Sequence, residues 1–113
     1  MNITLTKKFP FSASFKSKDR LVSHNYTLSV STACPNEGWG RTLESKVRES
    51  LICHIDSRDL GLDVDFLKNI EMTEMNILKI FWGRLQNVIQ PTQLILLSLE
   101  SDAHTQWSLS KEA

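Results

Sequence analysis

The sequence has no net charge, only two cysteines and no long hydrophobic run, and each of these absences narrows what the chain can be. Thirteen Lys and Arg residues balance 13 Asp and Glu residues. No basic stripe interleaved with aromatic residues is present, which argues against nucleic acid as a partner. Residues 1–15 alternate polar and apolar side chains, a pattern of neither a signal peptide nor a transmembrane helix. We therefore expect a cytoplasmic protein without a membrane partner.

Disulfide and calcium motifs are also missing. Cys34 and Cys53 are far apart and form no CxxC arrangement, so we interpret them as free thiols. Asp63 and Asp65 lack the further oxygen ligands and the glycine of a calcium loop. The chain has 113 residues and no linker divides it, which predicts one domain over residues 1–113.

Two segments near the amino terminus have the alternation of half-buried strands. Residues 3–15 are apolar at most odd positions. In residues 22–33, Tyr26, Leu28 and Val30 share one face and threonine or serine residues share the other. A short polar stretch separates the two segments, so we expect an antiparallel hairpin.

Two amphipathic helices and two further strands are predicted downstream. Apolar residues recur at helical spacing over residues 43–55, and a second helix begins at Thr73 and ends before Pro91. Residues 93–99 and 105–109 are rich in strand formers. The order ββααββ predicts an α+β fold, a four-stranded antiparallel sheet with two helices on one face.

The third strand of this predicted sheet carries apolar residues in both alternating sets. We expect Leu94 and Leu96 to point one way, and Ile95, Leu97 and Leu99 to point the other. A monomer would then expose an apolar patch on the face that the helices leave open. We therefore predict a homo-oligomer.

This element order and four short segments resemble the 6-pyruvoyl- and 6-carboxy-tetrahydropterin synthases. The resemblance implies the tunnelling fold, in which three chains close a barrel, two trimers often stack, and active sites lie between subunits. A trimer or hexamer is therefore expected. The four segments are Phe11-Ser-Ala-Ser-Phe15, Arg20-Leu-Val-Ser-His-Asn-Tyr26, Ile55-Asp-Ser-Arg-Asp-Leu60, and Thr73-Glu-Met-Asn76 with the later Leu99-Glu100.

The resemblance also identifies where the family's catalytic zinc would lie. Three histidines hold that ion in the family, and the matching positions here are Phe15, Val22 and His24. Phenylalanine and valine have no lone pair to donate, so only His24 remains of the metal site. We expect no zinc and no other cofactor, although His54 and His104 could in principle complete a different site.

The proton-transfer residues that the resemblance implies are changed as well. Lys18 stands where the family has its reactive cysteine, and Ser57 stands where it has a histidine. Asp56 is the remnant of this catalytic set. It can also be interpreted as an ordinary turn residue at a helix end.

The ring-binding residues of the family are better preserved. Glu100 matches the glutamate that accepts two hydrogen bonds from the pterin, and Thr73 and Asn76 match positions of a threonine-containing segment. Met72 and Met75 replace the proline and glutamate of that segment. Thr73 can alternatively be a helix N-cap, and Glu100 a solvated residue before a turn.

We interpret the chain as a tetrahydropterin synthase-like protein that binds a pterin or purine-like ring without catalysis. Two alternatives stay open. One is an active synthase or lyase that acts on dihydroneopterin triphosphate with altered chemistry. The other is a structural or regulatory subunit that assembles with an active relative or an unrelated partner.

Overall fold

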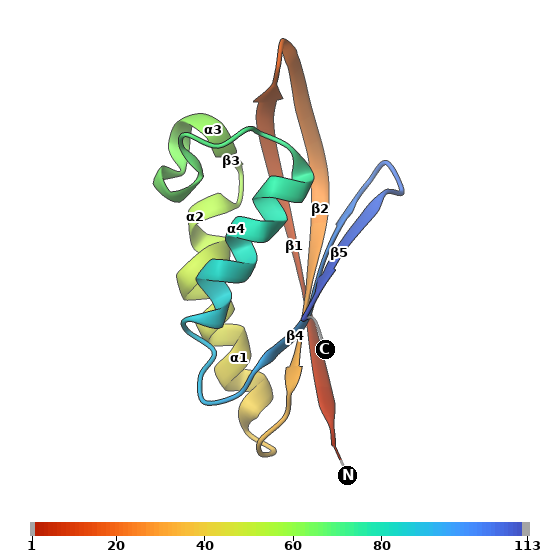
Figure 1. Cartoon of the computed structure of the whole chain (residues 1–113), viewed down its shortest axis with the longest axis vertical. Coiled ribbons are helices and arrows are strands. Elements are labelled where there is room, and N and C mark those ends of the chain that lie inside the picture. The colour runs from red at the N-terminus through yellow and green to blue at the C-terminus, as the bar shows by residue number, and fades with distance from the viewer. Residues whose placement is uncertain (1, 112–113) are drawn as a thin grey trace.

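The computed structural model describes residues 2–111, which form five strands and several helices (Figure 1). The strands are β1 (Thr4–Ser17), β2 (Arg20–Ala33), β3 (Arg58–Asp59), β4 (Leu94–Ser101) and β5 (Gln106–Ser110). The helices are α1 (Trp39–Val47), α2 (Cys53–Ile55), α3 (Leu60–Asp63) and α4 (Glu74–Gln86), with a π-helical segment (Arg48–Ile52) that joins α1 to α2 and a 3-10 turn (Asp65–Leu67) after α3.

One sheet with helices on a single face makes up the fold (Figure 1). The strand order is β3-β1-β2-β4-β5, and the four long strands are antiparallel. This confirms the expected α+β fold and its ββααββ order. The sheet has a fifth strand that the sequence pattern did not predict, because β3 is only two residues long and pairs in parallel with Ala13 and Ser14.

The core lies between the helices and the apolar face of the sheet. Phe9 on β1, Leu28 on β2, Leu43 on α1 and Phe81 on α4 are each at most 1% exposed. These are the apolar positions whose strand and helix periodicities predicted the elements. Burial of each such side chain contributes roughly 1.5–3 kcal/mol, so the sheet and helices stabilise each other.

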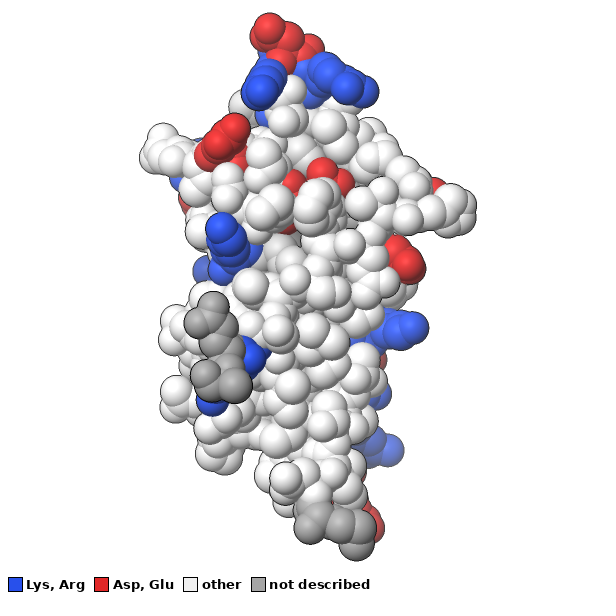
Figure 2. Space-filling model, turned by 45° about the vertical axis from the view of Figure 1, so that its right-hand side comes forward, with Lys and Arg blue, Asp and Glu red and all other residues white. Residues whose placement is uncertain are grey.

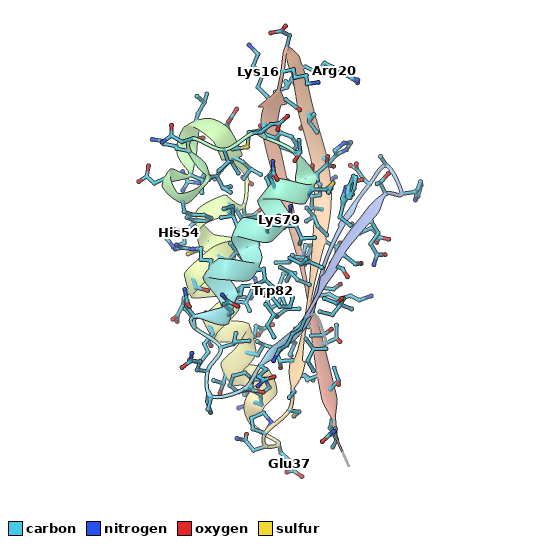
Figure 3. The ribbon with its side chains drawn as sticks, in the orientation of Figure 1. Lys16, Arg20, Glu37, His54, Lys79 and Trp82 are labelled. Carbon is cyan, nitrogen blue, oxygen red and sulfur yellow. The ribbon has the colours of Figure 1, made fainter. Side chains whose placement is uncertain are left out.

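The β1–β2 hairpin is longer than the rest of the sheet, and its tip projects past the helices (Figure 1). The two strands pair without interruption from Thr4 with Ala33 to Ser17 with Arg20. Lys18 turns the chain at the tip with a positive φ of 56°. Lys16 and Arg20 lie at the same end in Figure 3. Lys18, the residue that the resemblance matches to a reactive cysteine, therefore lies at this charged tip.

A bulge in β4 changes which leucines face the helices. Thr32 pairs with Leu94 and Ser31 pairs with Leu96, so Ile95 has no pairing partner in β2. The extra residue moves Leu94 onto the buried face with Leu97. The expected division of this strand, with Leu94 and Leu96 on one face, is therefore wrong.

The face of the sheet that the helices leave open is rich in hydroxyl groups. The Thr6 and Ser31 hydroxyl oxygens lie 2.6 Å apart between β1 and β2, and those of Ser98 and Ser108 lie 3.1 Å apart between β4 and β5. Leu96, which pairs with Ser31, lies on the same face, so this face is mixed and not the continuous apolar surface that the sequence pattern suggested.

The helices are short. Over residues 2–111, none is both long and apolar enough to cross a membrane.

Candidate functional site

A pocket of about 680 Å³ opens between β1, β2, the end of β4 and the residues that follow α2. It brings together Glu100 and Asp56, two of the residues that the family resemblance identified. The chain segments that form it are separated by 13 residues between Ser12 and Asn25 and by 44 between Ser12 and Asp56, so the pocket depends on the sheet pairing. The lining residues are Pro10, Phe11, Ser12, Asn25, Tyr26, Thr27, Asp56, Ser57, Glu100, Ser101, Asp102 and His104.

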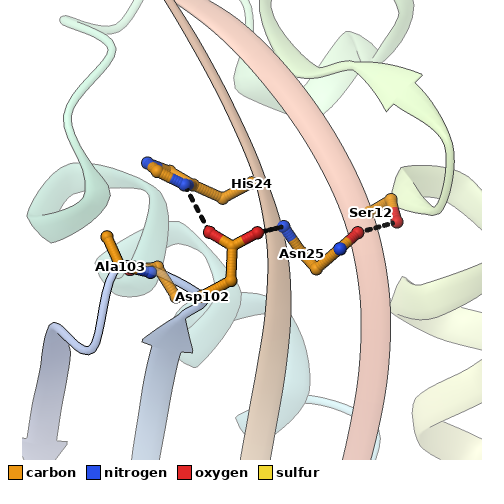
Figure 4. A network of polar contacts seen from close by, with 6 residues as sticks. Ser12, His24, Asn25, Asp102 and Ala103 are labelled. Atoms are coloured by element: carbon orange, nitrogen blue, oxygen red, sulfur yellow. Dashed lines mark hydrogen bonds and ion pairs between the residues drawn. The ribbon is translucent and has the colours of Figure 1, made fainter.

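Ser12 fixes one wall of the pocket. Its hydroxyl group donates a hydrogen bond of 2.6 Å to the Asn25 side-chain oxygen across the β1–β2 pair (Figure 4). Its backbone N–H donates to Oδ1 of Asp56 over 3.0 Å. Asp56 is therefore both a turn residue at the end of α2 and a pocket carboxylate with a defined position.

Asp102 fixes the opposite wall and ties the turn after β4 to β2. One carboxylate oxygen lies 2.6 Å from Nδ1 of His24, and the other accepts the backbone N–H of Asn25 over 3.0 Å (Figure 4). The Asp102 N–H in turn donates to the Asn25 carbonyl oxygen. The Asn25 N–H and, second, His24 hold the pKa of the Asp102 carboxyl below its usual range.

Two pocket residues have left-handed backbone conformations. Ser57 has a φ of 61°, and its N–H donates to the Ser12 carbonyl oxygen. His104 also has a φ of 61°, and its N–H donates to the Ser101 carbonyl oxygen. Positive φ is uncommon outside glycine, and such strain concentrates at functional sites. Both turns beside the pocket are therefore held in specific, unfavourable conformations.

Glu100 differs from the other two pocket carboxylates because its side chain is free. Its backbone is fixed by pairing with Thr27 and Gln106 on the neighbouring strands. The side chain is exposed and makes no hydrogen bond or ion pair with any residue in the range 2–111. Both of its oxygens are available to accept hydrogen bonds from a ligand.

Tyr26 supports the pocket from the core side. Its ring stacks on Phe11 at 5.4 Å, and the His24 ring meets it edge-on at 5.6 Å. The hydroxyl group is buried without a hydrogen-bond partner among the described residues. Burial raises the pKa of Tyr26, and the nearby charges of Glu74 and Asp102 raise it further. Tyr26 thus stays neutral and positions His24 by ring contact.

The residues at the family's metal position do not fit a zinc ion. Phe15 and Val22 are direct partners across the β1–β2 pair, and Phe15 is only 1% exposed. His24 directs Nδ1 to Asp102, as described above. His54 packs against Phe66 with a ring-centroid distance of 6.3 Å. Within residues 2–111, no group of three or more His, Cys, Asp or Glu side chains could hold a metal ion.

Thr73 and Lys18 lie outside the pocket. The Thr73 hydroxyl accepts the Asn76 N–H over 3.2 Å at the start of α4, so this residue is the helix N-cap. The Asn76 side chain donates to the Glu71 carbonyl oxygen. Neither Thr73 nor Asn76 contributes to the lining. Of the predicted ligand-binding pair, Glu100 and Thr73, only Glu100 is in the pocket.

Three polar residues that shape the pocket were not singled out from the sequence, namely Ser12, Asn25 and Asp102, and His104 was named only as a possible metal ligand. Asp102 had a visible signal, because an aspartate in a short polar connection often caps a neighbouring backbone group. The sequence did not indicate which backbone group it would reach. The pairing of β2 with β4 brings Tyr26 opposite Ser101, and this register places Asp102 beside His24 and Asn25.

The topology, with helices on one face of an antiparallel sheet that begins with a long hairpin, defines the tunnelling fold of the tetrahydropterin synthases. The structure of Caenorhabditis elegans 6-pyruvoyl tetrahydropterin synthase superimposes with a TM-score of 0.83 and 20% sequence identity, over 99% of this chain and 97% of that one. An uncharacterized protein from Wolinella succinogenes superimposes with a TM-score of 0.73 and 11% identity, over 99% of both chains. No protein-family model matches the sequence. No curated protein matches it either.

Proposed function

We propose that this protein binds a pterin or purine-like ring in the pocket around Glu100 and does not carry out the zinc-dependent synthase reaction. The observation that supports this most directly is the free Glu100 carboxylate, which lines a pocket large enough for a bicyclic ring. The tunnelling fold adds support, because a 6-pyruvoyl tetrahydropterin synthase shares it over nearly the whole chain.

The chemistry of Glu100 suits such a ring. A pterin or guanine presents an exocyclic amino group and a ring N–H as two parallel donors. A carboxylate presents two acceptor oxygens with the same spacing, and a charged acceptor strengthens both hydrogen bonds. Phe11 contributes apolar surface to the lining, and Ser12 and Thr27 contribute polar groups. The pocket therefore combines an apolar wall with a few directed polar groups, as ligand sites usually do.

The absence of synthase chemistry follows from the residues at the catalytic positions. Phe15 and Val22 cannot bind a metal, and Lys18 lies at the exposed hairpin tip. General acid–base help alone is typically worth about a hundred- to ten-thousand-fold in rate. A protein without the metal, the thiol and its partner histidine retains too few of these groups for the family reaction.

Calorimetric titration with neopterin, biopterin and guanosine tests the proposal. We expect one of these compounds to bind, and Glu100→Gln to weaken its binding by about 10- to 150-fold, the equivalent of losing one charged hydrogen bond. Glu37→Gln is the matched control, because Glu37 is exposed at the opposite end of the molecule from the hairpin tip (Figure 3). No binding at millimolar concentration, or binding that Glu100→Gln leaves intact, would rule the proposal out.

We also propose that the chain forms a homo-oligomer, a trimer or hexamer, through its two sheet edges. On its outer side β1 pairs only with β3, at Ala13 and Ser14, which leaves residues 4–11 open. β5 is the other edge strand. Open edges present unpaired N–H and C=O groups, and pairing β5 of one chain with β1 of the next would satisfy them. Sedimentation that gives a stable monomer at micromolar concentration would contradict this.

A further inference from the structure

We infer that the pocket selects an unphosphorylated ring and rejects its phosphorylated forms, an inference that rests on the proposed ring binding. Three carboxylates line the pocket, those of Asp56, Glu100 and Asp102, and the lining contains no lysine or arginine. Among the described lining residues, His104 is the one side chain with a basic group. The ligand class is therefore a neutral or cationic ring that carries N–H donors and, at most, a hydroxylated side chain.

Hydrogen bonds hold two of these carboxylates in position. Oδ1 of Asp56 accepts the Ser12 N–H, and the two oxygens of Asp102 are shared between His24 and the Asn25 N–H. For Asp102, the Asn25 N–H and, second, His24 also hold the pKa of the carboxyl below its usual range. Both charges are held in place by backbone groups, so they cannot turn away from a bound ligand without breaking these bonds.

The lysine and arginine side chains of the described residues lie outside this lining, although Arg58 directly follows the lining residue Ser57. Lys16, Lys18 and Arg20 are at the hairpin tip, which carries both signs of charge at the top of Figure 2. Lys79 is on α4, on the helix side of the sheet (Figure 3). Lys8 is on β1 but lies outside the pocket lining. A phosphate group in the pocket would meet three carboxylates and no lysine or arginine among the described lining residues, with the imidazoles of His104 and, behind Asp102, His24 as the nearest groups of the opposite kind.

The two kinds of ligand should consequently differ in affinity. Like charges repel, and the repulsion is stronger at a partly desolvated site than in water. A hydroxylated side chain instead meets hydrogen-bonding groups, because Ser12, Asn25 and Thr27 line the same pocket. The expected difference in affinity separates ring binding from synthase activity. A synthase acting on dihydroneopterin triphosphate would have to accept three phosphates at this site.

The experiment compares pairs of ligands that share a ring, on the native protein as purified and without divalent cations. The pairs are guanosine with guanosine 5′-triphosphate, and dihydroneopterin with its triphosphate. At low salt we expect the phosphorylated member to bind at least about tenfold more weakly, and the difference to shrink as salt rises because ions screen the repulsion. Asp56→Asn keeps an acceptor for the Ser12 N–H and removes one charge. It should therefore reduce the difference in affinity between the unphosphorylated ligand and its triphosphate. Glu37→Gln should leave it unchanged.

The outcomes separate this inference from the proposed function. Equal or tighter binding of the triphosphates overturns the charge selection and leaves ring binding intact. A difference that neither salt nor Asp56→Asn narrows also overturns it, because the cause would then not be charge. Failure of every ring compound to bind overturns the proposed function, and the selection with it.

Discussion

Thr73 has two competing roles, and a single substitution separates them. The family resemblance implies a part in ring binding, whereas the structure shows its hydroxyl group accepting the Asn76 N–H at the first turn of α4. This bond satisfies one of the four N–H groups that a helix leaves free at its start. Thr73→Ala removes the acceptor and keeps the backbone of the helix.

The magnitude follows from the geometry of the cap. Loss of an N-cap side chain typically costs about 1 kcal/mol, within a range of roughly 0.5–2 kcal/mol. The bond here is 3.2 Å long and the residue is half-buried, so we expect a value near the middle of that range. In a chain of this length such a loss lowers Tm by roughly 4 °C. Thermal unfolding followed by circular dichroism measures it.

Thr73→Ser is the matched control, because serine keeps the hydroxyl acceptor and should retain most of the stability. Ligand titration completes the test: Thr73→Ala should bind a ring compound as tightly as the original protein does, since Thr73 is outside the pocket lining. A Thr73→Ala variant with unchanged Tm and at least tenfold weaker ring binding would refute this reasoning and restore the role that the resemblance implies.

Three further substitutions test the core and the pocket wall. Trp39→Phe removes the 2.8 Å bond from Nε1 to the buried Thr32 hydroxyl and should lower the free energy of unfolding by about 1–3 kcal/mol in urea titrations. Phe81→Ala opens a cavity at a fully buried site and should lower it by about 3–5 kcal/mol. Because the pKa of Asp102 is lowered on folding, its charge stabilises the fold above the ordinary aspartate pKa of about 4. Asp102→Asn should therefore lose stability at neutral pH, and the difference from the original protein should disappear as the pH falls through the lowered pKa.

Hydrophobic periodicity was sufficient to predict most of the fold. The alternation over β1 and β2 and the helical spacing of Leu43 with its successors correspond to the buried positions of the structure. Two features carried no such signal. β3 is too short to show a period, and the bulge at Ile95 depends on how β4 aligns with β2. A single inserted residue exchanges the faces of a strand, and local sequence does not reveal where it falls.

The sequence predicted site residues only where a short motif identified them, and not where strand pairing brings distant residues together. Glu100 and Asp56 could be named from short motifs, and they lie in one pocket. The contact between His24 and Asp102 joins residues 78 positions apart, and only the register of β2 and β4 brings them together. Thr73 shows the opposite case, since its position in a motif suggested binding while its local structure explains it as a cap.

Phe15 and Val22, at positions that the resemblance matches to metal ligands, are connected through His24 and Asp102 to the wall of the pocket. Phe15 is buried in the core, and an imidazole there without a metal would leave polar nitrogens unsatisfied. Phe15 and Val22 avoid that problem because they are apolar, and His24 is the one histidine at the three positions that the resemblance matches to metal ligands. Asp102 provides the alternative partner, and through its bonds to Asn25 it also fixes the turn that carries His104 into the pocket. His24 therefore supports the pocket wall through Asp102, an arrangement compatible with the proposed ring binding at Glu100.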